Sequence, residues 1–290
     1  MTNEEIIRAK KQVEKIKILE KKLAAKKEYL MNKVHLCFDE GKIDTTQAED
    51  YILNYFWQHA YENYIYGGCM SNDLEFINHR FLYETSFFTK LFTDYKIDKD
   101  GAALDFGCGS AKYTEFFAKN FKKVIGVDIS ESTIEKCKQN NKLDNVEYIC
   151  ANILDCKIKE KFDFIYNGNT FMYIKDDLLV KEIIKKLTSM LKNKNSIFLV
   201  KESIAEHKRI DYKSINYIAY YRTIKDYSNF TNWDEVKINH VKQLEWFRKY
   251  CNIYPEKLDE FYKNPLCIDK IVPNYNKNGL SSCFLVVKGN

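Results

Sequence analysis

The stretch LDFGCGSA, residues 104–111, decides the fold. A short apolar run enters it, Gly107 and Gly109 turn the chain, and a helical pattern follows from Lys112. Glycine adopts positive φ at little cost and lets a ligand approach the backbone closely. The helix that leaves such a turn begins with free N–H groups. Because ligands of open α/β sheets bind beyond the carboxyl ends of the strands, we expect a ligand site at this turn.

The acidic residue in this stretch argues against a ligand that carries phosphate. Asp105 comes immediately before the glycines and would repel a pyrophosphate, and Lys112 stands where the dinucleotide fingerprint needs a glycine. A carboxylate at this place instead attracts a ligand with an ammonium and a sulfonium group. Asp128 ends the next apolar run, VIGVDIS, about 20 residues past the turn, where an acid can hold both hydroxyls of a ribose. The spacing therefore predicts a positively charged nucleoside ligand.

Strand and helix patterns alternate after residue 100. The apolar run AALDFG and the strand candidates VIGVDIS, VEYICAN, FDFIYNGN and SIFLVKES are interspersed with helical stretches at 112–120, 131–140 and 176–191. Such alternation predicts right-handed βαβ units and a parallel sheet. HVKQLEWFRKY predicts a further helix, and SCFLVVKG predicts a final strand inserted antiparallel. We expect an α/β fold with a Rossmann-like, seven-stranded, mostly parallel sheet that has helices on both faces.

The N-terminal part has a different, helical character. Residues 1–95 predict a helical extension or cap, and residues 96–290 predict the ligand-binding domain with a Tyr-rich insertion at about 204–235. Residues 4–32 repeat apolar positions every seven residues as a weak heptad, and residues 73–94 form an aromatic-rich helix. A solvated helix packed on its own body and a helix that makes a homodimer both fit the heptad.

Composition argues against several other classes of protein. The net charge is only +5, and the lysines are spread along the chain, whereas nucleic-acid-binding proteins concentrate their basic residues. No signal peptide begins the sequence, and no apolar run approaches the ~18 residues that span a bilayer. Nine cysteines without Cys-x-x-Cys pairs and five scattered histidines favour reduced thiols and no metal site. We expect a cytoplasmic protein without nucleic-acid or membrane partners.

LDFGCGSAKYTEFFAK followed by VIGVDISESTIEKCKQ resembles the class I S-adenosylmethionine-dependent methyltransferase family, over roughly residues 100–203. The resemblance implies S-adenosylmethionine as cofactor and S-adenosylhomocysteine as product, with the methionine portion at the glycine turn. It departs from the family at Asn152, where an acid is usual, and at Ala111, where a third glycine is common. The implied cofactor-binding residues are Asp105, Gly107, Cys108, Gly109, Asp128, Ile129, Asn152, Ile153, Asn167 and Gly168.

Methyl transfer from a sulfonium is an in-line displacement with a neutral leaving group, so alignment and desolvation of the acceptor are the main tasks. A hydroxyl or ammonium acceptor must also lose a proton. The candidate bases are Glu202, near the end of SIFLVKES, His207, which follows that strand, and Tyr173, where many family members carry histidine. A solvated loop position is the alternative for His207, and core positions are the alternative for most tyrosines. The candidate acceptor contacts are Tyr61, Tyr64, Tyr66, Asn169, Tyr220, Tyr221 and Arg222.

Three functions are compatible with this sequence. The favoured one is methylation of a small polar metabolite, such as a sugar or a nucleotide-linked compound, at an oxygen atom. The second is methylation of a protein N-terminal amine, because Tyr-Phe-Trp, Gly67-Gly68 and VKES with a following Tyr/Arg segment loosely resemble that family. The third is a scaffold that binds S-adenosylmethionine without transferring its methyl group.

Overall fold

The computed structural model describes residues 74–213, 218–239, 255–267 and 279–290. Backbone contacts divide the chain into two compact units, residues 1–54 with 213–218 and residues 55–212 with 219–290. The described residues belong almost entirely to the second unit. Several predictions lie outside the described residues, namely the helices at 4–32 and 240–250 and the acceptor contacts Tyr61, Tyr64 and Tyr66.

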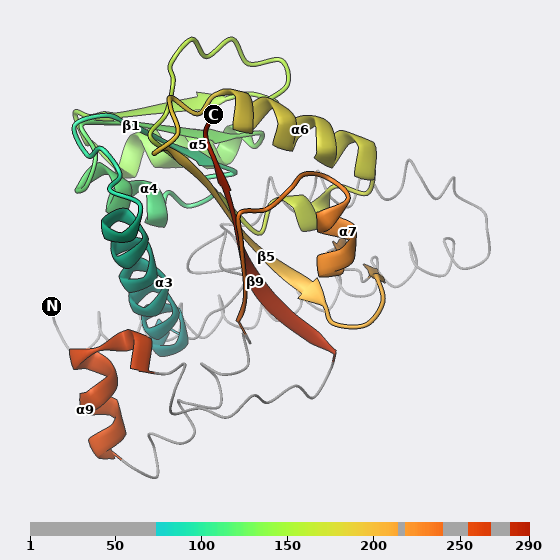
Figure 1. Cartoon of the computed structure of the whole chain (residues 1–290). Coiled ribbons are helices and arrows are strands. Elements are labelled where there is room, and N and C mark those ends of the chain that lie inside the picture. Colours follow the sequence, from blue (N-terminus) through green and yellow to red (C-terminus); the bar gives the residue numbers. More distant parts are fainter. Residues whose placement is uncertain (1–73, 214–217, 240–254, 268–278) are drawn as a thin grey trace, which may run out of the picture. The chain divides into compact units, whose positions relative to one another are not determined.

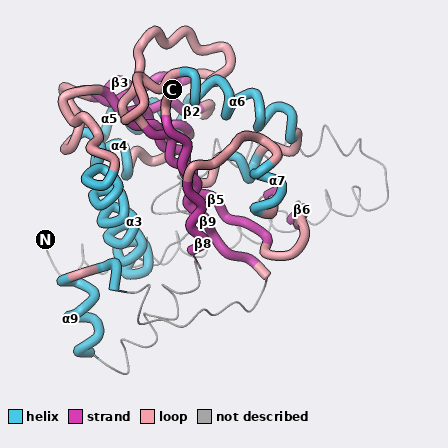
Figure 2. The backbone as a smooth tube through the Cα atoms, viewed as in Figure 1, coloured by secondary structure: helices cyan, strands magenta, loops and turns pink. Residues whose placement is uncertain are grey.

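A seven-stranded sheet with the order β3-β2-β1-β4-β5-β9-β8 forms the centre of this unit. Its first five strands pair in parallel, and β9 runs antiparallel between β5 and β8, which lie side by side in Figure 2. The predicted mostly parallel sheet and its antiparallel final strand are confirmed. The strands are β1 (Ala102–Phe106), β2 (Lys123–Asp128), β3 (Val146–Cys150), β4 (Phe164–Gly168), β5 (Ile197–Ala205), β8 (Glu235–Asn239) and β9 (Leu280–Lys288).

Helices cover both faces of the sheet, as predicted, with α3 on one side of the β5–β9 pair and α6 and α7 on the other (Figure 1). The helix predicted at 112–120 already ends at Ala118, and the Asn120 side chain beyond it donates to the Phe116 carbonyl of its last turn. The described helices are α3 (Leu74–Asp94), α4 (Lys112–Ala118), α5 (Glu131–Asn140), α6 (Asp177–Ser189), α7 (Ile224–Ser228) and α9 (Pro255–Lys263), with short 3-10 helices η2 (Phe171–Tyr173) and η3 (Pro265–Cys267).

Aromatic side chains fill the layer between α3, α4 and the sheet. Phe88 of α3 is fully buried and lies 5.0–5.8 Å, centroid to centroid, from the rings of Phe117 and Tyr166. Phe92, one turn later, packs edge-on against Phe164 of β4. The aromatic load of residues 74–94 therefore covers the sheet with a hydrophobic core.

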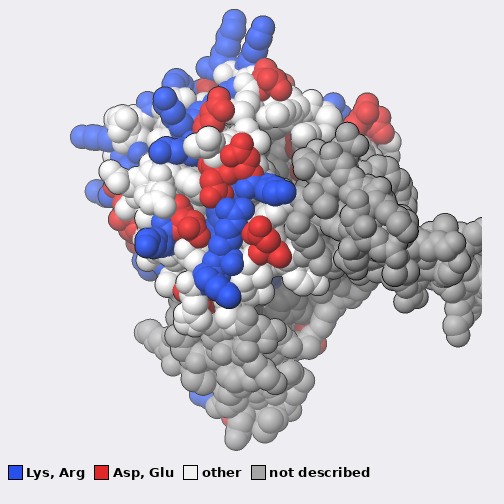
Figure 3. Space-filling model, turned by 90° about the vertical axis from the view of Figure 1, so that its right-hand side faces the viewer, with Lys and Arg blue, Asp and Glu red and all other residues white. Residues whose placement is uncertain are grey.

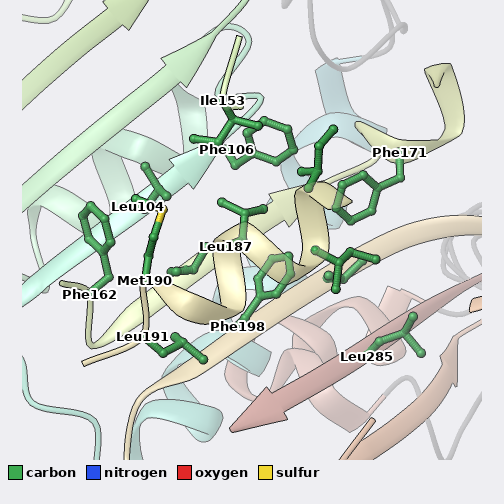
Figure 4. Packing of buried hydrophobic residues seen from close by; sticks show 14 of the residues in the cluster. Leu104, Phe106, Ile153, Phe162, Phe171, Leu187, Met190, Leu191, Phe198 and Leu285 are labelled. Atoms are coloured by element: carbon green, nitrogen blue, oxygen red, sulfur yellow. The ribbon is translucent and has the colours of Figure 1, made fainter. Parts of the chain in front are cut away.

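The opposite face of the sheet packs against α6. Successive strand residues point to opposite faces, so Ala103 of β1 joins the α3 layer whereas Leu104 and Phe106 join the α6 layer. Figure 4 shows this second cluster, with Leu187 of α6 among side chains of β1 and β5 such as Phe198. The alternation directs each polar residue at the strand ends to a defined face.

The sequence did not predict β8 as a strand. Its sequence EVKIN exposes Val236 and Ile238, whereas Lys237 extends over the Phe87 ring of α3 at 4.8 Å. The apolar side chains thus face outward and the lysine lies over an aromatic ring, which reverses the usual pattern. The Tyr-rich insertion also contains elements that were not predicted, namely the two-stranded sheet of β6 (Ile210–Lys213) and β7 (Ile218–Tyr221) and the helix α7.

The surface charge is mixed rather than segregated. In Figure 3, the described part of one face carries lysine and arginine side chains interspersed with aspartate and glutamate side chains.

Within the described ranges, no helix combines the length and the apolar character that crossing a membrane requires.

Replacing Phe88 with alanine tests the α3 layer. We expect Phe88→Ala to lower the free energy of unfolding by ~3–5 kcal/mol, because it leaves a cavity among fully buried aromatic rings. Leu178→Ala is the control, since Leu178 is 77% exposed and should change stability by less than ~0.5 kcal/mol. Urea denaturation measures both, and equal losses would contradict the packing described.

Candidate functional site

The glycine turn after β1 has the backbone geometry that the sequence demands. Gly107 and Gly109 have φ of 70° and 49°, and Ala111, where a third glycine is common in the family, has φ of 61°. The Gly107 and Cys108 N–H groups donate to the Val127 carbonyl of β2 at 2.8 and 3.0 Å. These bonds fold the turn back over the end of β2.

The turn also lies directly against the chain that follows β4. A Cβ atom on Gly107 would come within 2.1 Å of the Thr170 hydroxyl oxygen. The Thr170 hydroxyl in turn donates to the Phe106 carbonyl at 3.4 Å. The carboxyl ends of β1, β2 and β4 therefore meet at one place, and only a glycine fits at position 107.

Asp128 ends β2 with its carboxylate oriented by two backbone groups. The Gly109 N–H donates to Oδ2 at 3.0 Å, and the Ser130 N–H donates to Oδ1 at 2.9 Å. Burial raises the pKa of Asp128, and these N–H groups oppose that rise. A carboxylate accepts about four hydrogen bonds, so each oxygen retains capacity for a ligand hydroxyl. Ile129 beside it is 65% exposed and offers an apolar surface.

Asp105 is a second, deeper carboxylate at the same edge of the sheet. It is buried, and the Thr114 hydroxyl of α4 donates to its Oδ2 at 2.5 Å. Burial, with a smaller contribution from the negative charge of Asp128, raises the pKa of Asp105 to about 7, although hydrogen bonds from Thr114 oppose the rise. Near neutral pH this carboxyl group therefore carries a partial negative charge that a cationic ligand would complete.

The other predicted cofactor residues in the first part of the domain differ in exposure. Cys108 is buried and packs in a small cluster with Ile134 and Cys137 of α5. Asn152 is exposed, and its side-chain oxygen accepts the Leu154 N–H at 3.0 Å, which fixes the turn after β3. The Ile153 side chain lies in the α6 cluster, so any contact with a ligand would come from its backbone.

The segment that follows β4 is tightly bent. Asn169 has φ of 60°, its N–H donates to the Lys201 carbonyl at 2.7 Å, and its side chain accepts the Ser203 hydroxyl at 3.2 Å. Asn167, at 0% exposure, donates from Nδ2 to Glu202 Oε1 at 2.7 Å. Gly168 lies between them, so the predicted contacts Asn167, Gly168 and Asn169 stand at the end of β4 beside the glycine turn.

The three candidate bases lie in unlike environments. Glu202 is completely buried, and burial raises its pKa to about 7 although Asn167 and the Phe171 N–H oppose the rise. His207 is exposed in the loop between β5 and β6. Tyr173 is half-buried in η2, where its N–H donates to the Thr170 carbonyl at 3.1 Å.

The predicted acceptor contacts in the Tyr-rich insertion are buried. They are Tyr220 and Tyr221 in β7 and Arg222 directly after it.

Sequence reasoning missed a buried polar group on the α3 face. Glu84 of α3 and Lys201 of β5 lie 3.6 Å apart, and the Tyr113 hydroxyl of α4 donates to Glu84. Burial by itself would raise the pKa of Glu84, but Arg80 and Lys201 bring it below its usual value. The available signal was the presence of charged residues beside apolar runs, Glu84 within FLYETSFF and Lys201 with Glu202 after the apolar start of FLVKES.

Comparison with known proteins agrees with this geometry. Residues 103–194, from β1 to just beyond α6, match the family model of a methyltransferase domain. The chain carries a methyltransferase domain. Its glycine turn, Asp128 and the end of β4 all lie within the matched span. Among the described residues, no group of three or more His, Cys, Asp or Glu side chains is placed to hold a metal ion.

Curated relatives match this chain over a part of its length. A malonyl-[acyl-carrier protein] O-methyltransferase from Priestia megaterium is 33% identical over 98 residues, which are 33% of this chain and 35% of that protein. Phosphoethanolamine N-methyltransferase 3 from Arabidopsis thaliana is 31% identical over 129 residues, 43% of this chain and 26% of that protein. The matches thus span about a third or less of these relatives' own length.

Solved structures share the fold of the methyltransferase domain over a larger part of the chain. An S-adenosylmethionine-dependent methyltransferase of the DUF858 family from Leishmania major aligns with a TM-score of 0.57 at 12% identity, covering 81% of each chain. Coclaurine N-methyltransferase bound to N-methylheliamine and S-adenosylhomocysteine aligns with a TM-score of 0.50 at 14% identity, covering 69% of this chain and 71% of that one.

The close approach at Gly107 predicts a measurable difference between two glycines. Gly279 also has positive φ, at 65°, but nothing lies within 4 Å of an added Cβ atom. We expect Gly279→Ala to cost ~1–2 kcal/mol of stability from backbone strain alone. Gly107→Ala should cost a further ~1–3 kcal/mol, because the new methyl group must displace Thr170. If urea denaturation gave equal losses of stability for the two variants, the glycine turn at Gly107 would not be in contact with Thr170.

Proposed function

We propose that this chain transfers a methyl group from S-adenosylmethionine to an oxygen atom of a small polar metabolite, such as a sugar or a nucleotide-linked compound. The carboxylate of Asp128 carries this proposal. It stands at the end of β2, oriented by the Gly109 and Ser130 N–H groups and next to the glycine turn. This arrangement suits the two hydroxyls of a ribose.

The chemistry of the surrounding groups fits S-adenosylmethionine, which supplies an electrophilic methyl group on a sulfonium. Gly107 and Gly109 would lie against the methionine portion, and Asp105 would attract its positive charges. Asp128 would hold the ribose, and the exposed Ile129 side chain would cover one face of the adenine. Asn152 and the Ile153 backbone would border the adenine from the turn after β3.

The end of β4 would align the acceptor with the methyl group. Thr170, which follows Gly168 and Asn169, contacts Gly107 of the glycine turn. Alignment together with exclusion of water is the main contribution an enzyme makes to this transfer. Proton removal from an acceptor hydroxyl falls to His207 or Tyr173, because both are at least partly open to solvent whereas Glu202 is fully enclosed.

A screen identifies the acceptor and separates the three candidate functions. The full chain is incubated with isotopically labelled S-adenosylmethionine and either fractionated polar metabolites or peptides with free N-termini, and products are identified by mass. Label in a small hydroxyl compound supports the proposal. Label on a peptide amine shows the protein N-terminal activity, and binding of the cofactor without label transfer shows a scaffold.

Asp128 can be tested without knowing the acceptor. We expect Asp128→Ala to weaken binding of S-adenosylhomocysteine by about 100-fold or more, because each of the two ribose hydrogen bonds to the carboxylate contributes about 1.5–3 kcal/mol. Asp144→Ala is the matched control, since Asp144 is an exposed acid before β3, at the opposite edge of the sheet. Calorimetric titration measures both, and an unchanged affinity in Asp128→Ala contradicts the ribose assignment.

Asp105 predicts a pH dependence of cofactor binding. Its pKa of about 7 means that it loses its proton as the pH rises through neutrality. The ammonium group of S-adenosylhomocysteine, its one cationic group, favours the ionised form. Affinity for this ligand should therefore rise between about pH 6 and 8, by up to about tenfold for each unit by which the ligand lowers that pKa. Asp105→Asn should remove this part of the rise. A profile that is the same in both proteins excludes the electrostatic role.

A further inference from the structure

Two fully buried charged side chains hold the segment after β4, and the transfer chemistry gives neither of them a task. This segment, residues 169–176, contains η2 and lies against the cofactor turn through Thr170. Glu202 comes from β5, and Arg222 follows β7; both are 0% exposed. Burying a charge is costly unless it is paired and hydrogen-bonded, so their partners indicate their purpose.

Glu202 binds the N–H groups of the segment. Its Oε1 accepts the Phe171 N–H at 2.9 Å, and its Oε2 accepts the Met172 N–H at 3.2 Å. The Asn167 side chain adds a third donor at 2.7 Å. The carboxylate therefore faces the protein backbone on the α6 side of the sheet, where an acceptor molecule would have to displace these N–H groups to reach it.

Arg222 binds the carbonyl groups of the same segment. Its Nη1 donates to the Phe171 carbonyl at 2.9 Å, and its Nη2 donates to the Ile174 carbonyl at 2.7 Å and the Lys175 carbonyl at 3.3 Å. Its Nε donates to Asp177, the first residue of α6, at 2.8 Å. The rigid guanidinium fork supplies donors that a lysine could not place simultaneously.

Asp177 connects Arg222, which follows β7, with Arg209, which precedes β6. Arg209, just before β6, donates from Nη1 to both Asp177 oxygens at 2.9 and 3.0 Å. Arg209 also donates to the Lys175 carbonyl at 3.1 Å. The two arginines at the base of the β6–β7 pair are thus bonded to the segment after β4 and to the start of α6.

We propose that Glu202 and Arg222 are positioning residues that fix the backbone of residues 171–175 from its N–H side and its carbonyl side, respectively. This inference rests on the proposed function, because the segment so fixed carries Asn169 and Thr170 beside the cofactor turn. Glu202 transfers no proton in this assignment. Through Asp177 and Arg209, the β6–β7 pair that follows β5 is tied to the end of β4 at which the methyl group would lie.

The test combines amide hydrogen exchange with cofactor binding in the full chain. Arg222→Gln removes the fork, and Arg209→Gln is the matched control, because Arg209 shares Asp177 but makes no bond to the Phe171 or Ile174 carbonyl. We expect Arg222→Gln to speed exchange in residues 171–174 about tenfold and to weaken S-adenosylhomocysteine binding about tenfold, as loss of charge-assisted hydrogen bonds implies. Exchange in β1 and β2 should not change, and Arg209→Gln should have less than about a twofold effect on either measurement.

Two results would overturn the positioning role. One is unchanged exchange at 171–174 in Arg222→Gln; the other is faster exchange spread equally over β1 and β2, which denotes a general loss of stability. If Arg222→Gln does not fold, Glu202→Gln decides, since it must speed exchange at Phe171 and Met172 selectively. If the unaltered chain does not bind S-adenosylhomocysteine, the proposed function is contradicted. The positioning role is still tested in that case, because exchange at residues 171–174 can be measured without the ligand.

Discussion

The position of β1 between β2 and β4 is the constraint on which the rest of this site depends. Strand order reverses around β1, so the connections from β1 and β4 leave on opposite faces at the carboxyl ends of these strands, which is where open α/β sheets bind ligands. Two contacts define this junction: the Gly107 N–H donates to the Val127 carbonyl, and Gly107 lies against Thr170. Each proposed cofactor residue of β1, β2 and β4 is placed by this junction.

Buried charges on the two faces of the sheet reinforce the junction. Lys201 and Glu202 are consecutive residues in the middle of β5 and therefore point to opposite faces. Lys201 meets Glu84 of α3, whereas Glu202 meets the segment after β4. Such groups rarely add net stability compared with apolar residues of similar size, but removing one partner leaves an unpaired buried charge. These buried pairs therefore define the positions of α3 and of the segment after β4 rather than adding net stability.

Fixed positions of these segments suit a reaction in which alignment of the reactants matters more than acid–base catalysis. A sulfonium leaving group becomes neutral, so the protein need not stabilise a departing anion, and the geometry of acceptor, methyl group and sulfur dominates. A glycine turn, an oriented carboxylate and a loop fixed from both sides supply geometry of this kind. The two relatives named above methylate oxygen in one case and nitrogen in the other, which is consistent with a common donor side and a variable acceptor side.

The sequence by itself determined the order of strands and helices from 102 to 205, the positive φ at Gly107 and Gly109, and the placing of Asp105 and Asp128 at strand ends. These are local properties, since periodicity, turn chemistry and spacing act within about 30 residues. Only the tertiary structure decided the partners of Glu202 and Arg222, which lie 31 and 51 residues from Phe171 in the chain. It also decided that β8 joins the sheet with Lys237 over Phe87. Long-range partners depend on which face of the sheet each side chain meets, and no local pattern encodes that choice.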